Sequence, residues 1–405
     1  MTMRRGAARR ASCPVHHRPD DARPRRTAWA LLYAGLWLVS AVPGLARAPA
    51  DHSKDPPVRP LSVATLGDAL QDAQQKAFFT PFTARTHIAI HAGSWDGTLA
   101  ALQNRARIGG TFPDRDLVLM DNSSVLVACQ QGLLLPLDPA AVRAPASMSH
   151  DTPDPDAVSR CGLGALRIDL VLAWDKSRID AMPGWPDFWD VARRPGKRGL
   201  GRDPRGTLEI ALLADGIAPD SIYRTLATSE GLDRAFRKLD QLKPYIVWWD
   251  TPAQAAHTIE SGAVLMTSAP NGEVAAADLI GHRDFGIQWQ QSVSMMLSWA
   301  VPGRPHPLGT EPGAADGAAS PDAAGRMAHI RQLLDFTDEP DRQAAFVGLY
   351  SAISVVPDVL APDQALPEDS PSTPQHLHDA MRQDDAFWAT HLGPIKARFD
   401  AWIGN

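Results

Sequence analysis

The sequence is poor in cysteine and has no long apolar run in its main body. Only 3 of its 405 residues are Cys, which excludes a disulfide-dense scaffold and a metal site built from four thiolates. After residue 50, no apolar stretch reaches the ~20 residues that a membrane-spanning helix needs. The chain beyond that point is therefore expected to lie outside the membrane.

Signatures of catalysis are also missing. The sequence contains no G-x-S-x-G, H-E-x-x-H, G-x-G-x-x-G or phosphate-loop lysine motif. No pair of carboxylates has a spacing that indicates general acid–base catalysis. His376 and His378, two positions apart in a Pro-rich stretch, could bind a metal, but solvated side chains are the simpler interpretation. These absences favour a protein that is not an enzyme and uses neither a cofactor nor a metal.

Charge is distributed unevenly along the chain. Residues 1–50 contain nine Arg and two Asp, a balance of +7, whereas the remainder carries −13 and brings the total to −6. Phosphate binding needs clustered Lys and Arg, so an acidic body of this kind is not expected to bind nucleic acid.

What the sequence does contain is an ordinary globular composition, with 44% apolar and 21% charged residues. A chain of 405 residues predicts about two folding units. Two stretches interrupt the regular patterns: residues 303–325, a low-complexity insertion rich in Pro, Gly, Ala and Asp, and Pro362–Pro374.

The N-terminus has the pattern of a cleaved secretory signal. An Arg-rich segment precedes Ala28–Val42, fifteen apolar or small residues, and Ala46-Arg47-Ala48 follows. We expect residues 1–50 to be removed, so that the mature chain begins near Pro49 or Asp51 in the periplasm; a membrane anchor is the alternative. Export would leave Cys129 and Cys161, which in an oxidising compartment either form a disulfide or remain two buried thiols.

Hydrophobic periodicity from residue 61 onward alternates between strand and helix, which predicts an α/β fold with a parallel sheet. Thr251-Pro252-Ala253-Gln254 is a helix-start signature. At the C-terminus, aromatic and aliphatic residues at helical spacing over Asp384–Ile403 predict a core-facing helix. The expected strands are Leu61–Leu66, Ile88–His91, Leu117–Met120, Ile168–Trp174, Arg198–Gly201, Tyr245–Trp249, Ala263–Ser268 and Gly286–Gln290.

Several segments, in order, resemble the substrate-binding proteins of bacterial polyamine-type ABC transporters, from about residue 60 to the C-terminus. They are LSVATLGDALQDAQQKAFFTPFTARTHIAI, DLVLMDNSSVLVACQQGLLLPLD, WPDFWDVARRPGKRGLGRDPRGTLEIALLADG and FWATHLGPIKARFDAW. The resemblance implies a two-lobed periplasmic binding protein fold of type II, with the ligand cleft between the lobes. It also implies a disulfide, because the same branch carries Cys where this chain has Cys129 and Cys161.

The implied lobes are discontinuous in sequence. Residues 51–160 with about 300–357 would form the first lobe, and residues 161–299 with about 358–405 the second. In open α/β sheets, ligands bind at the loops that lead from strands into helices. Carried over to those loops, the resemblance implies a set of ligand-binding residues: Leu66, Gly67, Asp68, Asn122, Ser123, Asp203, Thr207, Trp249, Asp250, Thr251, Asn271 and Met295.

This chain departs from the polyamine pattern at several of these positions. Leu66 and Met295 stand where the family has Trp, and Pro270 replaces an aromatic residue. Carboxylates remain at Asp68 and Asp203, so a small polar and cationic ligand is expected, held mainly by carboxylates. For an anionic ligand, helix N-termini and Arg205 would be the better candidates.

Together with the signal pattern, the resemblance implies a monomeric, exported solute-binding protein that captures a small molecule by lobe closure and delivers it to an ABC permease. A secreted α/β hydrolase, and a binding protein that serves a sensor, are the alternatives.

Overall fold

The structure is a computed structural model that describes residues 59–107, 115–137, 157–281, 284–303, 321–354 and 370–404. All of these residues belong to one compact unit, Asp55–Asn405. No helix in these ranges combines the length and apolarity needed to cross a membrane. The expected signal peptide and the 303–325 insertion lie wholly or largely outside the described residues.

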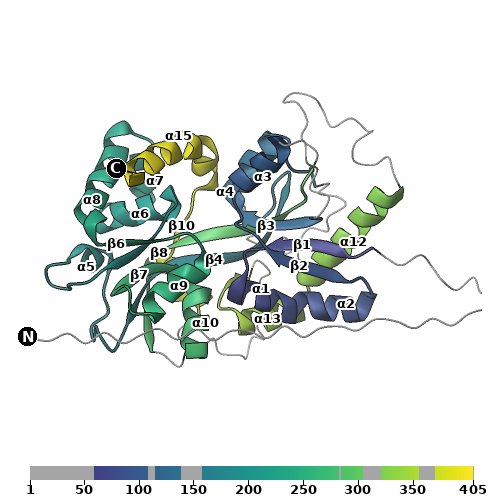
Figure 1. The fold of residues 1–405 in the computed structure, drawn as a ribbon, viewed down its shortest axis with the longest axis horizontal. Helices are drawn as coiled ribbons and strands as arrows, with labels where there is room; N and C mark the ends of the chain where they lie inside the picture. Colours follow the sequence, from purple (N-terminus) through teal and green to yellow (C-terminus); the bar gives the residue numbers. More distant parts are fainter. Residues whose placement is uncertain are drawn as a thin grey trace, which may run out of the picture. The chain divides into compact units, whose positions relative to one another are not determined.

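One mixed sheet connects the whole unit, with the strand order β2-β1-β3-β8-β4-β7-β5-β6 (Figure 1). Strands β1, β2 and β3 are mutually parallel, as are β5, β6 and β7, whereas β8 and β4 run antiparallel to their neighbours in the middle of the sheet. The strands are β1 (Leu61–Thr65), β2 (Ile90–Ser94), β3 (Leu117–Asp121), β4 (Gly162–Asp175), β5 (Arg198–Gly201), β6 (Ile246–Trp249), β7 (Met266–Pro270), β8 (Phe285–Ala300), β9 (Ile353–Ser354) and β10 (Met381–Arg382).

The two central strands are much longer than the sequence pattern predicted. β4 has 14 residues and β8 has 16, against the expected Ile168–Trp174 and Gly286–Gln290. Nearly every residue of β4 is buried, so its two faces do not alternate in polarity. Two register shifts interrupt the pairing of β4 with β8, and Gln291 of β8 has φ 62°. These irregularities bend the long strands between the two halves of the sheet.

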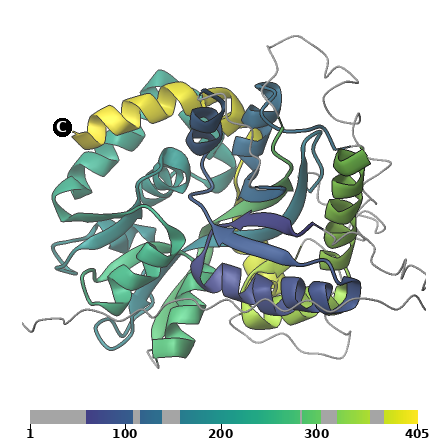
Figure 2. The ribbon, with the colours of Figure 1, turned by 45° about the vertical axis from the view of Figure 1, so that its right-hand side comes forward.

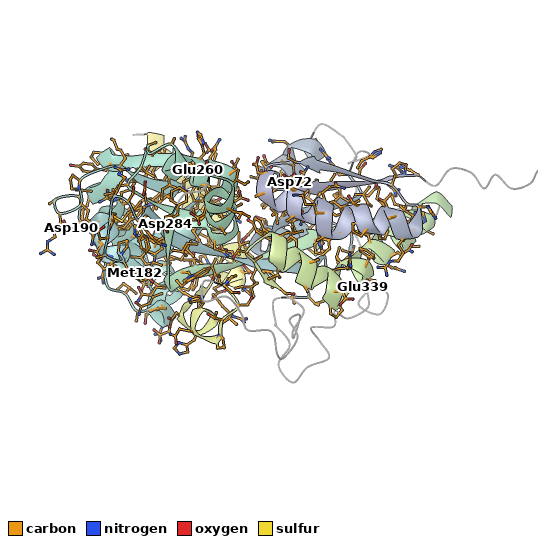
Figure 3. The ribbon with its side chains drawn as sticks, turned by 90° about the horizontal axis from the view of Figure 1, so that it is seen from below. Asp72, Met182, Asp190, Glu260, Asp284 and Glu339 are labelled. Carbon is orange, nitrogen blue, oxygen red and sulfur yellow. A yellow bond between two sulfur atoms is a disulfide. The ribbon has the colours of Figure 1, made fainter. Side chains whose placement is uncertain are left out.

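Helices cover both faces of this sheet (Figures 1 and 2). Figure 3 views them from below, with Asp72 labelled on α1 and Glu260 on α9. The helices are α1 (Asp68–Gln74), continued by the π-helix Gln75–Phe79 and α2 (Thr80–Thr86), α3 (Leu99–Arg107), α4 (Asn122–Gln130), α5 (Trp185–Trp189), α6 (Pro204–Ala214), α7 (Ile222–Leu226), α8 (Ser229–Leu242), α9 (Pro252–Glu260), α10 (Asn271–Gly281), α12 (Pro321–Thr337), α13 (Pro340–Leu349), α14 (Pro374–Asp379) and α15 (Asp385–Gly404).

Two large hydrophobic clusters lie at opposite ends of the sheet. Core A joins β1 and β3 to α1, α2, α12 and α13, and core B joins β5 to α5–α8 and α15. Strands β4 and β8 contribute to both: Leu163–Ile168 face core A, whereas Leu170–Trp174 face core B. Met295 of β8 packs against both clusters. Strands β4 and β8 thus connect two bodies, one built around core A and the other around core B.

Two further expectations are confirmed in the structure. Cys129 at the end of α4 and Cys161 at the start of β4 form a disulfide across a sequence separation of 32. In α15, the C-terminal apolar stripe faces core B: Phe387, Trp388, Leu392, Ile395 and Phe399 are buried, and Trp402 packs beside them.

Candidate functional site

Arg205 lies where the two bodies of the fold meet. It follows β5 in the first residues of α6, where Arg205 has ψ 135° and Gly206 has φ 75°, so the regular helix begins only at Thr207. A Cβ atom on Gly206 would come within 2.5 Å of Leu170 Cδ2. Glycine is therefore required for this turn, both by its left-handed φ and by the close approach of Leu170.

The guanidinium of Arg205 binds groups from both bodies. On its own side it forms a bidentate pair with Asp203, with Nε–Oδ1 and Nη2–Oδ2 distances of 2.9 Å. From the other side, at the end of β3 and the start of α4, Asp121 Oδ1 lies 2.6 Å from Nη1, and the hydroxyls of Ser123 and Ser124 accept at 3.1 and 2.8 Å. An ion pair between Asp121 and Arg205 thus joins core A to core B.

The electrostatics of this centre keep Arg205 and Asp203 ionised at neutral pH. Burial opposes the positive charge of Arg205, but Asp203 and Asp121 outweigh it and raise the pKa of the guanidinium. Burial alone would raise the pKa of Asp203. The charge and hydrogen bonds of Arg205 have the larger, opposite effect, so the pKa of Asp203 is lowered overall. Two carboxylates around one guanidinium give the centre an excess of negative charge.

A polar network behind Asp121 connects it to the C-terminal segment. Gln383 Nε2 donates to Asp121 Oδ2 at 3.0 Å and to Asp385 Oδ1 at 2.8 Å. Asn122 donates to Asp385 Oδ2 at 2.9 Å and accepts from Ser298 at 3.0 Å. Because Gln383 and Asp385 are both buried, they fix the orientation of the Asp121 carboxylate.

A cavity of about 490 Å³ opens beside this network. Its lining consists of Pro219, Asp220, Tyr223, Met381, Arg382, Gln383, Asp384, Asp385 and Ala386. The Oε1 atom of Gln383 is buried and has no hydrogen-bond partner among the described residues. The lining of the cavity thus combines carboxylates with the guanidinium of Arg382 and apolar side chains.

Asp68 lies at the start of α1, where it is exposed. Its charge acts on Glu273 of α10. Glu273 is 4% exposed and accepts a hydrogen bond from the Tyr350 hydroxyl at 3.2 Å. Burial raises the pKa of Glu273 to about 7. Asp68 belongs to α1 of core A, whereas Glu273 belongs to α10, whose Val274 and Ala277 pack in a separate buried cluster with α9.

The remaining sequence-based candidates fall into two sets. Some have structural partners. Thr207 donates a hydrogen bond to Gly201 O, and Thr251 caps α9. Asp250 forms an ion pair with Arg202, and the Asn271 side chain bonds to the backbones of Asp169 and Ser351. The others differ in their surroundings. Asn122 and Ser123 belong to the Arg205 network. Leu66 and Met295 pack against core A, and Trp249 packs on Gly201. Gly67 is buried as the N-cap of α1.

Sequence reasoning missed the partners that complete the centre. Asp121 and Ser124 flank the chosen residues Asn122 and Ser123, and only the three-dimensional pairing distinguishes them. Gln383 directly precedes the predicted C-terminal helix and Asp385 lies in its first turn, so nothing in the sequence distinguished them from ordinary polar residues at the start of a helix. Asp203 was expected to bind ligand, and in the structure its carboxylate binds Arg205.

Comparison with known proteins gives a consistent result. The family model described as bacterial extracellular solute-binding protein matches residues 77–372. The gamma-aminobutyric acid-binding protein of Pseudomonas aeruginosa is 33% identical over 377 residues, covering 92% of this chain and 98% of the relative.

Solved structures share the fold. An ABC transporter substrate-binding protein from Bradyrhizobium japonicum superposes with a TM-score of 0.70 at 25% identity, covering 85% of this chain and 99% of that one. The binding protein MotA of Agrobacterium tumefaciens, in complex with glucopine, gives 0.72 at 24% identity with the same coverage. The two bodies described above are thus the lobes of a periplasmic binding protein fold.

Proposed function

Because the chain belongs to the family of bacterial extracellular solute-binding proteins, we propose that it is the binding component of an ABC importer for a small amino acid that carries one carboxylate and one ammonium group. Such proteins bind small molecules and work with a permease, and they are not enzymes. The ligand class is the new element of the proposal.

The observation that carries this proposal is the ion pair between Asp121 and Arg205. The lobes present opposite charges to each other across the site, with an Oδ1–Nη1 distance of 2.6 Å. A zwitterion can insert between them, with its carboxylate on Arg205 and the hydroxyls of Ser123 and Ser124, and its ammonium on Asp121. One ion pair is then replaced by two, and no charge is left buried without a partner.

Other ligand classes complement this arrangement less well. A polyamine would meet Asp121, but it would also approach the guanidinium of Arg205, and like charges in a closed cleft are costly. A dicarboxylate would satisfy Arg205 and leave Asp121 facing an anion. The sequence-based expectation of a cationic group is retained here in the ammonium, while the polyamine itself is not favoured. The name of the Pseudomonas aeruginosa relative, a gamma-aminobutyric acid-binding protein, supports the same class.

For export, oligomeric state and partner, the proposal keeps the sequence-based expectations. Cleavage near Pro49 or Asp51 would release the mature chain into the periplasm, where it would act as a monomer and deliver its ligand to the permease. The lobe limits given above, 51–160 with about 300–357 and 161–299 with about 358–405, are kept with one change: Leu163–Ile168 and Leu297 pack in core A, so we propose that the chain passes between lobes within β4 and β8.

Isothermal titration of the mature protein with three small molecules tests the ligand class. Gamma-aminobutyric acid has both charges, putrescine has only ammonium groups, and glutarate has only carboxylates. We expect the amino acid to bind at least tenfold more tightly than either of the others, because each of them leaves one member of the Asp121–Arg205 pair facing a like charge. Putrescine binding as tight as that of the amino acid would contradict the proposal.

A further inference from the structure

We propose that Asn271 and Glu273, at the start of α10, clasp the segment Tyr350–Ser351 and hold the two lobes in the arrangement that binds ligand. These contacts, called the clasp below, set how tightly any ligand binds, whereas Arg205 and Asp121 decide which ligand is preferred. The statement about ligands rests on the proposed function. The statement about the lobes concerns the protein without ligand and can be tested separately.

Helix α10 belongs to the lobe of core B. It directly follows β7, which pairs in parallel with β5 of core B. Its residues Val274 and Ala277 pack with Ala173 of β4 in a cluster that also contains α9. Successive residues of a strand point to opposite faces, and Leu172 and Trp174, on either side of Ala173, face core B. The α10 cluster therefore covers the other face of the same strands and moves with core B.

Tyr350 belongs to the lobe of core A. It follows α13, is 3% exposed and packs in core A, where its ring stacks on Phe346. A few residues later, Ser354 of β9 pairs with Leu166, which lies in the part of β4 that packs in core A. The segment Tyr350–Ser351 is thus fixed to this lobe at both ends.

Three contacts join the start of α10 to this segment. The Tyr350 hydroxyl donates to Glu273 Oε1 at 3.2 Å, and the side-chain amide of Asn271 donates to the backbone carbonyl of Ser351. The Tyr350 ring also lies against the backbone of Gly272, where a Cβ atom would come within 2.3 Å of the ring carbon Cζ. Only glycine permits this close approach. Asn271, Glu273 and Tyr350 are all buried, so water does not compete for their hydrogen bonds.

The clasp lies at the point where β4 passes from one lobe to the other. The strand packs in core A up to Ile168 and in core B from Leu170 onward, so Asp169 is its boundary residue. Asn271 Oδ1 accepts from the backbone N–H of Asp169 at 2.9 Å. The side chain of Asn271 therefore connects the boundary of β4 with Ser351 of the other lobe, and it fixes the angle at which α10 meets that lobe.

The clasp and the Asp121–Arg205 pair restrain the lobes from opposite faces of the sheet. Figure 1 shows α10 and α13 on one face of the sheet and α4 and α6 on the other. Both connections form in the same arrangement of the lobes. A rotation that spared one of them would move the other, so two connections favour closure more strongly than one. A ligand that binds Asp121 and Arg205 replaces their pair but leaves the clasp intact, so the clasp favours closure with and without ligand.

The first test measures the arrangement of the lobes without ligand. Cys129 and Cys161 form a disulfide, so in the mature protein nitroxide labels react with cysteines introduced by Asp72→Cys on α1 and Arg237→Cys on α8. Both positions are exposed, and the two helices belong to cores A and B. Double electron–electron resonance then reports the distances between the lobes.

Two substitutions weaken the clasp in this labelled protein. Tyr350→Phe removes the hydroxyl that donates to Glu273 and keeps the ring, whereas Gly272→Ala adds a Cβ that pushes the ring away. Each should give a second distance population, with the ratio of the two populations shifted about three- to tenfold from the wild type, as expected for the loss of about one hydrogen bond. Gly348→Ala is the matched control, because it lies two residues before Tyr350 on α13 and its Cβ would have no atom within 4 Å. It should keep the wild-type distances.

The second test compares two ligands by calorimetric titration of the unlabelled variants. When fewer molecules are in the closed arrangement, every ligand loses affinity by the same factor. Tyr350→Phe should therefore bind both gamma-aminobutyric acid and butyrate about three- to tenfold more weakly and keep the wild-type ratio of their affinities. A variant that was merely less stable would instead show fewer binding sites at unchanged affinity.

The outcomes separate the clasp from the proposed function. Wild-type distances in both Tyr350→Phe and Gly272→Ala, or an equal shift in Gly348→Ala, overturn the clasp. Should Gly272→Ala not fold, Tyr350→Phe decides alone. A changed ratio of the two affinities in Tyr350→Phe overturns the division of roles between the clasp and the Asp121–Arg205 pair. Shifted distances in a protein that binds neither gamma-aminobutyric acid nor butyrate would support the clasp and count against the proposed function.

Discussion

The side chain of Arg205 uses its N–H donors in two directions, toward Asp203 within its own lobe and toward Asp121, Ser123 and Ser124 across the cleft. A planar, forked cation can do both at once, whereas the ammonium of lysine is a single point charge. Arg205→Lys should therefore keep the charge but lose part of this geometry. We expect binding of gamma-aminobutyric acid to weaken by about 10- to 100-fold, in line with the loss of one or two charge-assisted hydrogen bonds.

Arg202→Lys is the matched control for this substitution. Arg202 lies in the same loop, and its guanidinium pairs with Asp250 at 3.2 Å in an exposed setting. Exposed ion pairs contribute little, so this variant should bind as the wild type does in the same calorimetric titration. Equal effects of the two substitutions would show that Arg205 has no special role.

Residue types were easier to predict from the sequence than their partners. A carboxylate at Asp203 and polar residues at Asn122 and Ser123 were expected at strand ends, and the structure places all three in or beside the Arg205 centre. The sequence could not show that Asp203 forms an ion pair with Arg205. Nor could it show that Asp121, 84 residues from Arg205 in the sequence, binds the same guanidinium. Such pairing depends on how two lobes meet, and no local pattern encodes it.

At the scale of the helix, the first turn of α6 depends on Gly206. In Gly206→Ala the residue keeps a φ of 75° and its Cβ meets Leu170 Cδ2 at 2.5 Å. We expect a loss of about 2–4 kcal/mol of unfolding free energy from backbone strain and overpacking together, measured by urea denaturation, and weaker ligand binding because Arg205 is displaced.

Gly216→Ala separates the effect of backbone strain from that of overpacking. Gly216 ends the same helix with φ 83°, and no atom lies within 4 Å of the position its Cβ would take. This variant should lose only the conformational part, about 1–2 kcal/mol, and should bind ligand normally. Equal losses in the two variants would mean that the contact with Leu170 contributes nothing.

The disulfide fixes the end of α4 to the start of β4. It closes a loop with a sequence separation of 32, for which the chain-entropy model gives about 3–4 kcal/mol. Replacing both Cys129 and Cys161 by Ser should lower the free energy of unfolding by about this amount in urea. The same loss should appear when the wild type is reduced before denaturation, whereas a reductant should leave the double variant unchanged; a wild type indifferent to reductant would refute the assignment.

Elements with a clear period were predictable, and those without one were not. Strands β1, β3 and β5 and the C-terminal helix α15 agree closely with the sequence patterns. The long strands β4 and β8 were underestimated, because strands buried on both faces lose the alternation that marks a half-exposed strand. These two strands carry the connection between the lobes, so the element most important for lobe movement was also the least visible in the sequence.

At the scale of the whole molecule, the Asp121–Arg205 pair acts on the balance between open and closed lobes. It joins the lobes without a ligand, so it favours closure, and a ligand that inserts into it must replace that contribution. Loss of the carboxylate in Asp121→Asn should shift the unliganded protein toward the open form. Small-angle scattering should then give a larger radius of gyration for the variant than for the wild type.

The ligand preference of Asp121→Asn tests the same idea chemically. With the carboxylate gone, the ammonium of gamma-aminobutyric acid loses its partner while the carboxylate keeps Arg205. We expect affinity for the amino acid to fall about 10- to 100-fold and to approach that of butyrate, which has the carboxylate alone. Asp72→Asn, in an exposed position on α1, should change neither quantity. If Asp121→Asn kept a strong preference for the amino acid over butyrate, the ammonium would have to bind elsewhere, and the cavity whose lining includes Asp220, Asp384 and Asp385 would be the place to look next.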